Sequence, residues 1–241
     1  MTKTFKVLSA MLSYPTEELQ AAAPEFAGIL EQEGLVPAMD RQALSPLLQE
    51  LAGQSIYELQ ERYVLLFDRT RSLSLHLFEH IHGESRDRGQ AMVDLAAHYE
   101  QQGLTISVRE LPDYLPLFLE FLSTLPLNEA CDLLEQPLHI VSALATRLQR
   151  RDSVYAAAVR ALEALARTKP ETAAVQSMLD ESEDDPNDLA ALDAIWEETE
   201  VVFGPGAQGD DNCPRVSDIL NRMAANPAGT GQAGQPDVNG S

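Results

Sequence analysis

Two histidines and a glutamate lie within five residues of one another, as His76, Glu79 and His80. This His-x-x-Glu-His spacing is the inverted zinc-protease pattern, with two imidazoles one helical turn apart and a carboxylate between them. His82 adds a further candidate metal ligand. The pattern fixes few residues, and Gly83 follows before a long helix can form around it. We therefore expect a structural role for these histidines, with a zinc hydrolase as the alternative.

A dense run of opposite charges begins at Glu84 and includes Arg86 and Arg88. Together with Arg69, these arginines could hold a phosphate or a carboxylate, because a guanidinium group binds such anions through paired N–H donors. The simpler interpretation is that a helix begins here at the protein surface. Ser85 caps this helix, and the arginines point into the solvent. We favour the simpler interpretation because exposed charges usually bind nothing specific.

The sequence lacks the common signatures of cofactor enzymes and hydrolases. It contains no phosphate-binding P-loop, no glycine-rich dinucleotide fingerprint after a strand and no nucleophile elbow. Its two cysteines, Cys131 and Cys213, are too few for an ordinary iron–sulfur cluster or a disulfide framework. A reducing cytoplasm is therefore the expected compartment.

Helices are expected to position any site, since apolar residues recur at three- and four-residue spacing along most of the chain. Thr16 is expected to cap a helix that Pro24 kinks or restarts. Ser55 and Glu58 fit a capping box before another apolar face. Neither strand alternation nor a fixed-period repeat is apparent. The pattern predicts an all-α, single compact domain of about nine to eleven helices.

Composition divides the chain into a helical domain at residues 1–203 and a flexible tail at residues 204–241. The last part of the domain, residues 171–200, carries eleven acidic and no basic side chains. Beyond residue 203 the sequence is rich in Gly, Pro, Asn and Ala, which is typical of disorder. A short amphipathic helix near residues 215–224 is expected only as a transient element.

The balance of 38 acidic against 17 basic residues gives a net charge of −21. An acidic surface repels nucleic-acid phosphates and anionic lipids, so neither is an expected partner, whereas a basic segment would be attracted. No stretch approaches the roughly 20 apolar residues that span a bilayer. The short apolar run near the N-terminus is expected to form a helix and not a signal peptide.

The most distinctive segment runs from residue 110 to residue 120. Pro112 and Pro116 fix the backbone at a helix start, and Asp113 is well placed to cap that helix. The helix that follows is apolar nearly all round, so it either lies in the centre of the core or lines an apolar groove. Periodicity alone favours the centre of the core.

Three stretches carry a likeness to one known family: residues 61–69, residues 77–95 and residues 110–113. On these motifs the chain resembles the molybdenum-cofactor assembly chaperones of respiratory nitrate reductase, the delta subunit family within the redox-enzyme maturation chaperones. The likeness covers residues 1 to about 200. The family usually has histidine after the Pro-Asp pair, where this chain has Tyr114. A proton or ligand role is therefore in doubt at this position, while a packing or hydrogen-bonding role can survive.

The resemblance implies a cytoplasmic chaperone that is not an enzyme. Such a protein binds the N-terminal segment of the immature catalytic (alpha) subunit, assists insertion of the molybdenum cofactor and delays docking to the membrane subunit. It implies no stably bound cofactor and no metal. An apolar groove between helices suits an amphipathic client helix, and an acidic rim would steer a basic segment. The candidate peptide-binding residues are Tyr63, Phe67, Asp68, Phe78, Glu79, His80, Asp113, Tyr114, Pro116 and Phe118.

Two further interpretations stay open at this point. Direct carriage of the cofactor would assign Arg69, Arg86 and Arg88 to its phosphates. For each aromatic candidate taken alone, burial in the core is at least as plausible as a place in the groove.

Overall fold

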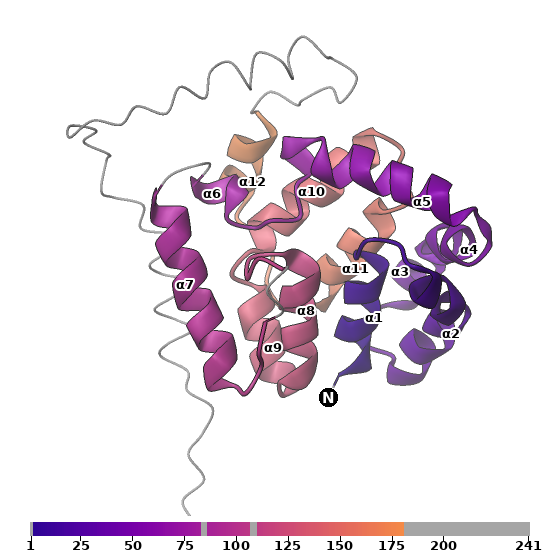
Figure 1. Ribbon diagram of the computed structural model, residues 1–241, viewed down its shortest axis with the longest axis horizontal. Helices are drawn as coiled ribbons and strands as arrows, with labels where there is room; N and C mark the ends of the chain where they lie inside the picture. Colours follow the sequence, from indigo (N-terminus) through magenta and orange to yellow (C-terminus); the bar gives the residue numbers. More distant parts are fainter. Residues whose placement is uncertain (1, 83–85, 107–109, 181–241) are drawn as a thin grey trace, which may run out of the picture.

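The computed structural model describes residues 2–82, 86–106 and 110–180, and the chain is helical within these ranges (Figure 1). Its α-helices are α1 (Lys3–Met11), α2 (Glu17–Glu33), α3 (Ala38–Ala43), α4 (Ser45–Gly53), α5 (Ile56–Tyr63), α6 (Glu79–His82), α7 (Arg86–Gln101), α8 (Leu115–Thr124), α9 (Leu127–Leu134), α10 (Leu138–Arg150), α11 (Ala156–Leu165) and α12 (Thr172–Leu179). A π-helical turn, η1 (Val64–Asp68), directly follows α5, and a 3-10 turn, η2 (Arg71–Leu73), comes next. The described residues contain one isolated β-bridge and no strand, which confirms the all-α prediction.

Local sequence signals set several helix ends. The Thr16 hydroxyl accepts the Leu19 amide at 3.2 Å and caps α2, and Gly34 ends this helix in a left-handed conformation with φ of 65°. Of the two predicted effects of Pro24, the restart is wrong, because α2 continues through this residue, and the kink stays a prediction. Packing of the flanking residues into the core outweighs the loss of one backbone hydrogen bond. Ser55 precedes α5 without a side-chain cap, so the predicted capping box does not form.

The core lies where α1, α8, α10 and α11 meet (Figure 1). The main helix–helix contacts join α1 to α8 and α2, α10 to α11 and α12, and α2 to α4. Nine of the thirteen residues of α10 and seven of the ten residues of α8 are buried, so both are central helices. The expectation that the apolar helix after the two prolines lies in the core is therefore confirmed.

Several predictions concern residues outside the described ranges. These are the flexible tail at residues 204–241, its short helix near residues 215–224 and most of the acidic stretch at residues 171–200. The start of that stretch forms α12. Cys131 is buried and free, while Cys213 lies outside the described part. None of the described helices is both long and apolar enough to span a lipid bilayer.

A carboxylate from the end of α2 caps the start of α1. Glu33 accepts the backbone amides of Lys3 at 2.8 Å and Thr4 at 2.6 Å, and the Thr4 hydroxyl at 2.7 Å. Burial acts to raise the pKa of Glu33, but the bonds from Thr4 and Lys3 outweigh it and hold this pKa below its usual value. The same carboxylate lies at the positive end of the α1 dipole. This contact therefore fixes the end of α2 against the start of α1.

We expect Glu33→Gln to lower the free energy of unfolding by about 1 kcal/mol at neutral pH, because a neutral amide accepts these bonds more weakly. Since the folded-state pKa of Glu33 is lowered, its contribution is present above the unfolded-state pKa and is lost as the pH falls through the folded-state pKa. Urea unfolding at neutral and acidic pH measures both effects. Glu31→Gln, an exposed change in the same helix, is the matched control, and an equal loss in both variants would contradict the capping role.

Candidate functional site

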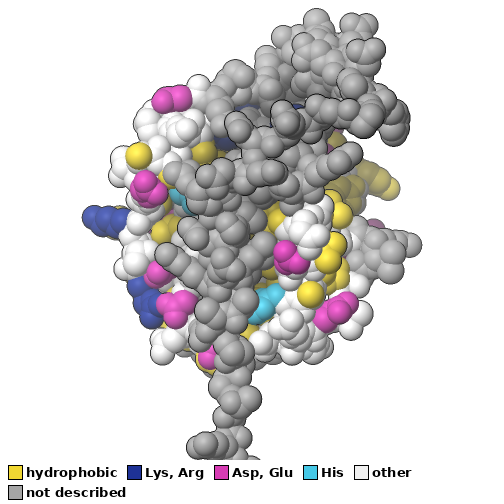
Figure 2. Space-filling model, turned by 90° about the vertical axis from the view of Figure 1, so that its left-hand side faces the viewer, with side chains coloured by type: hydrophobic (Ala, Val, Ile, Leu, Met, Phe, Trp, Pro, Cys, Tyr) yellow, Lys and Arg dark blue, Asp and Glu magenta, His cyan; other side chains and the backbone are white. Residues whose placement is uncertain are grey.

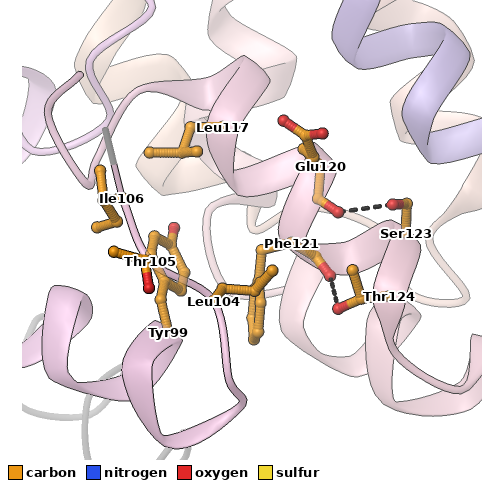
Figure 3. A pocket seen from close by; sticks show the side chains of 9 residues that line it. All are labelled: Tyr99, Leu104, Thr105, Ile106, Leu117, Glu120, Phe121, Ser123 and Thr124. Carbon is orange, nitrogen blue, oxygen red and sulfur yellow. Dashed lines mark hydrogen bonds between the residues drawn. The ribbon is translucent and has the colours of Figure 1, made fainter. Parts of the chain in front are cut away.

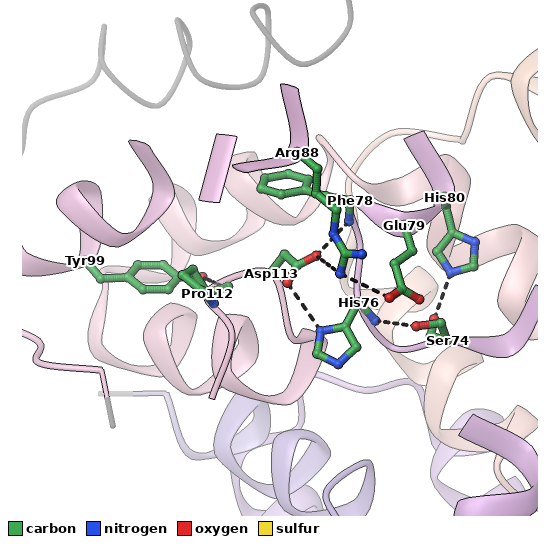
Figure 4. A network of polar contacts seen from close by, with 9 residues as sticks. All are labelled: Ser74, His76, Phe78, Glu79, His80, Arg88, Tyr99, Pro112 and Asp113. Carbon is green, nitrogen blue, oxygen red and sulfur yellow. Dashed lines mark hydrogen bonds and ion pairs between the residues drawn. The ribbon is translucent and has the colours of Figure 1, made fainter. Parts of the chain in front are cut away.

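Two short segments that are distant in sequence lie side by side in the folded chain (Figure 4). Residues 74–80 carry the His-x-x-Glu-His pattern, and the second segment carries the Pro-Asp pair before α8. His76 and Tyr114 form an antiparallel β-bridge, and the Leu77 amide donates to the Asp113 carbonyl at 3.0 Å. The tertiary structure therefore joins two of the three motifs of the sequence into one unit.

Asp113 is the centre of a polar network within this unit (Figure 4). Its side chain is fully buried. One carboxylate oxygen accepts the Phe78 amide at 3.2 Å and lies 3.6 Å from the guanidinium of Arg88 in α7. The other oxygen lies 3.3 Å from Nδ1 of His76. A buried carboxylate without partners would be costly, so these contacts are what allow Asp113 to lie in the core.

The predicted helix-capping role of Asp113 is wrong. Tyr114 precedes the first residue of α8 and makes no side-chain cap, and Pro116 occupies the first turn. Because proline has no backbone N–H, this helix start has fewer amides that need an acceptor. The Asp113 carboxylate is therefore available to residues 76–78 and to α7.

The side chains of the His-x-x-Glu-His pattern point to separate partners. His76 contacts Asp113, Glu79 pairs with Arg88 at 3.1 Å, and Nε2 of His80 lies 2.7 Å from the Ser74 carbonyl. Burial lowers the pKa of His80. Within the described ranges, no three His, Cys, Asp or Glu side chains converge as a metal site would require. The geometry thus gives no support to the zinc hydrolase, and the side chain of His82 lies outside the described part.

Opposing effects act on the pKa of His76. Partial burial acts to lower it, but the hydrogen bond and the negative charge of Asp113 outweigh burial and raise the pKa above its usual value. The charge of Glu79 acts in the same direction, and Arg88 acts against it. A protonated His76 therefore strengthens the contact between the two segments.

Tyr114 connects this unit to α5. Its hydroxyl lies 2.6 Å from the Tyr63 hydroxyl, which in turn donates to the Leu12 carbonyl at 2.9 Å. The Tyr114 ring also packs on the His76 ring, with 5.3 Å between centroids. Burial raises the pKa of Tyr114 to about 12, so the phenol stays neutral. Packing and hydrogen bonding are thus the observed roles of Tyr114.

Most candidate peptide-binding residues lie inside the protein. Tyr63, Phe67, Phe78, Pro116 and Phe118 are buried with Asp113, while Asp68 is exposed and Glu79, His80 and Tyr114 are partly buried. The π-helical turn η1 turns Phe67 inward against Tyr63, with 4.9 Å between ring centroids. The buried members of the set are core residues in this conformation, and direct contact with a peptide stays a prediction.

Of the three candidate phosphate-binding arginines, the structure describes the side chains of Arg69 and Arg88, and these two have different surroundings. Arg88 faces Glu79 and Asp113, whereas Arg69 is exposed at the end of η1. The side chain of Arg86 lies outside the described part. The proposal that they jointly hold a cofactor phosphate stays a prediction without a geometric basis in these residues.

An apolar hollow of about 250 Å³ opens between the end of α7, the segment after it and α8 (Figure 3). We call it the α7–α8 hollow. It is lined by Tyr99, Leu104, Thr105, Ile106, Leu117, Glu120, Phe121, Ser123 and Thr124. The Tyr99 hydroxyl donates to the Pro112 carbonyl at 2.9 Å, which ties α7 to the Pro-Asp segment beside Asp113. Sequence reasoning missed residues 104–106, because a short connection after a helix carries no motif.

Two polar residues that line the α7–α8 hollow, Ser123 and Thr124, form their hydrogen bonds within α8 and need no partner inside the hollow. The hydroxyls of Ser123 and Thr124 donate to carbonyls of their own helix, at 2.6 Å and 2.7 Å (Figure 3). Glu120 is exposed at the rim, where it lies 3.6 Å from Lys6. On the α7 side of the molecule, hydrophobic atoms reach the surface with acidic side chains between them (Figure 2). The hollow is thus an apolar depression with a charged edge.

We expect Asp113→Asn to lower the free energy of unfolding by about 2–4 kcal/mol, because it leaves the partly buried Arg88 and His76 without their shared anion. Chemical denaturation measures the loss. Glu110→Gln removes a charge from an exposed position in the same segment and is expected to have little effect. A small loss for Asp113→Asn as well would show that the network contributes little to stability.

We expect His76→Gln to cost more stability at about pH 5.5 than at about pH 8.5. The folded-state pKa of His76 is raised, so its contribution is complete below the unfolded-state pKa and is lost as the pH rises through the folded-state pKa. His98→Gln is the matched control, because burial lowers the pKa of His98 and the pH trend should reverse. Urea unfolding across this range measures both variants, and the same trend in both would contradict the assignment.

Comparisons with known proteins place the chain among its relatives. Residues 32–161 match the family model of the nitrate reductase delta subunit. The nitrate reductase molybdenum cofactor assembly chaperone NarJ of Escherichia coli (strain K12) is 44% identical over 82% of this chain and 83% of its own length. NarW of the same strain is 39% identical over 82% of each chain.

The fold has a counterpart among solved structures. A crystal structure described as that of a redox enzyme maturation protein from Archaeoglobus fulgidus covers 68% of this chain and 91% of its own, with a TM-score of 0.50 and 24% identity. This likeness supports the fold, while the family model and the sequence identities identify the family. The chain therefore belongs to the nitrate reductase delta subunit family.

Proposed function

We propose that this protein is an assembly chaperone of respiratory nitrate reductase. It binds the N-terminal segment of the immature catalytic (alpha) subunit in the cytoplasm and assists insertion of the molybdenum cofactor before membrane docking. The observation that carries the proposal is the apolar α7–α8 hollow in a member of this family. It acts by binding and not by catalysis, and it holds no cofactor stably.

The α7–α8 hollow has the size and lining to receive a few apolar side chains. Its volume of about 250 Å³ lies below the ~300–1,000 Å³ of typical small-molecule sites. Leu104, Ile106 and Leu117 are partly buried at its walls, above the buried rings of Tyr99 and Phe121. An amphipathic helix that presents apolar residues at positions i, i+3 and i+4 suits such a depression.

Charge at the rim favours a basic client segment. Glu120 lines the hollow, and Glu100, next to Tyr99, is exposed. The Lys6–Glu120 pair is more than half exposed on both sides, so a basic residue of a client can replace Lys6 at little cost. Such contacts speed association and make affinity depend on salt.

The buried network keeps the wall of the hollow in place. Asp113 and Arg88 join α7 to the start of α8, and Tyr99 adds a second tie through Pro112. We assign this positioning role to Asp113 with Arg88 and Tyr99. Direct peptide contact stays a prediction for the ten candidate residues, none of which lines the hollow: Tyr63, Phe67, Asp68, Phe78, Glu79, His80, Asp113, Tyr114, Pro116 and Phe118.

We expect a peptide with the N-terminal sequence of the catalytic subunit to bind the full-length protein in isothermal titration calorimetry. Ile106→Gln and Leu117→Gln are expected to weaken binding about tenfold or more, because each puts a polar amide into the apolar contact. Met39→Gln is the matched control, since Met39 is exposed on α3 and does not line the hollow.

Thermal unfolding of each variant separates loss of binding from loss of fold. Unchanged affinity in both hollow variants would place the client elsewhere on the protein. If the peptide gives no heat at any salt concentration, and a catalytic subunit truncated at its N-terminus is still captured, the proposed client segment is wrong.

A further inference from the structure

A strip of exposed and partly buried side chains continues from the α7–α8 hollow along α8. Leu117, Glu120 and Thr124 line the hollow (Figure 3), and their three- and four-residue spacing places them on one face of this helix. Tyr114 lies one turn before Leu117, and its carbonyl accepts the Phe118 amide at 3.0 Å, as in the first turn of a helix. Tyr114, which is partly buried, therefore extends this face beyond the hollow.

Helix α1 packs beside α8 and runs antiparallel to it (Figure 1). The Thr2 amide donates to the Ser123 carbonyl at 2.8 Å, near the end of α8. The Ser9 hydroxyl donates to the Pro116 carbonyl at 2.6 Å, near the start of α8. The residues that follow α1 therefore lie toward the start of α8, at the Tyr114 end of the strip.

Two tyrosines, Tyr14 and Tyr114, meet at this end. Tyr14 is 44% exposed, and its ring contacts the Tyr63 ring edge-on, with 5.6 Å between centroids. The Tyr63 hydroxyl in turn lies 2.6 Å from the Tyr114 hydroxyl. Because both contact the side chain of Tyr63, the two tyrosines lie close to one another. We call Tyr14 and Tyr114 the tyrosine end.

The tyrosine end lies about two helical turns from the hollow. Phe121 lines the hollow and is buried, and it follows Tyr114 by seven positions. At a rise of about 1.5 Å per residue, this part of α8 spans about 10 Å. A client helix that lies along α8 has the same rise, so its residues i and i+7 reach both places from one face.

The charge near the tyrosine end suits a basic client. Glu17 and Glu18 closely follow Tyr14 in sequence, Glu110 precedes Tyr114 by four positions, and all three are exposed. The lysines of α1, Lys3 and Lys6, lie toward the other end of that helix. Acidic charge at this end favours basic residues in the part of the client that reaches it.

We propose that the client helix lies along α8 and makes two apolar contacts. One apolar residue enters the α7–α8 hollow, and a second, about seven residues away in the client, packs against the tyrosine end. Tyrosine rings are frequent anchors at protein interfaces. This inference rests on the proposed function, and it assigns Tyr14 as a specificity-determining residue for the client.

Calorimetry with the full-length protein and the peptide of the catalytic subunit's N-terminal sequence tests the second contact. We expect Tyr14→Ala to weaken binding about fivefold and Tyr14→Phe, which keeps the ring, to bind as the unmodified protein does. Tyr57→Ala is the matched control, because Tyr57 is 79% exposed on α5. Thermal unfolding checks each variant. Intermolecular nuclear Overhauser effects between the Tyr14 ring and the peptide give a second readout that needs no substitution.

Double-mutant cycles locate the two contacts on the client. Each apolar residue of the peptide is replaced by alanine in turn, and each peptide is titrated into the unmodified protein, Tyr14→Ala and Leu117→Ala. We expect one peptide residue to couple to Tyr14 and another to couple to Leu117, about seven positions apart.

The outcomes separate this inference from the proposed function. Unchanged affinity in Tyr14→Ala, together with weaker binding in Leu117→Ala, would overturn the second contact and leave the proposed function standing. Coupling of Tyr14 and Leu117 to the same peptide residue would overturn the arrangement along α8. A peptide that does not bind the unmodified protein would contradict the proposed client segment and this inference with it.

Discussion

The buried carboxylate of Asp113 is the constraint on which the rest of the site depends. A charge at this depth must be matched by donors, and its donors come from other parts of the chain: the Phe78 amide, the His76 ring and Arg88. The contacts of these donors with the Asp113 carboxylate therefore fix the positions of residues 76–78, the start of α8 and α7 relative to one another. Apolar side chains in its place would pack these elements without setting their register.

The α7–α8 hollow follows from this arrangement. Arg88 and Tyr99 lie three turns apart on α7, and both reach the Pro-Asp segment, through the Asp113 carboxylate and the Pro112 carbonyl. These two ties hold α7 along α8, so Leu104 and Ile106 face Leu117 and Phe121 across an opening. In the function that we propose, this opening is the surface for apolar groups that the client has not yet buried.

Charge is distributed unevenly over this fold. Acidic groups lie near the hollow, where they favour a basic client, whereas arginines gather where α10 ends beside η2.

The sequence by itself determined the helical class, the central place of the apolar helix after the two prolines and the likeness to the family. These follow from local periodicity and from motifs that are contiguous in the chain. It also located the residues of the polar network, but not their roles. The His-x-x-Glu-His pattern suggested a metal site, and Asp113 suggested a helix cap, because spacing gives no information about partners 35 residues away.

Only the tertiary structure decided that Asp113 faces His76, that Phe67 and Phe78 are core residues and that residues 104–106 line a hollow. The physical reason is that burial and pairing depend on contacts between distant segments, whereas periodicity reports only which face of a helix is apolar. An aromatic side chain on an apolar face has the same pattern in a core and in a groove. Contacts between distant segments are what distinguish the two, as where the Phe67 ring packs on the Tyr155 ring at 5.1 Å between centroids.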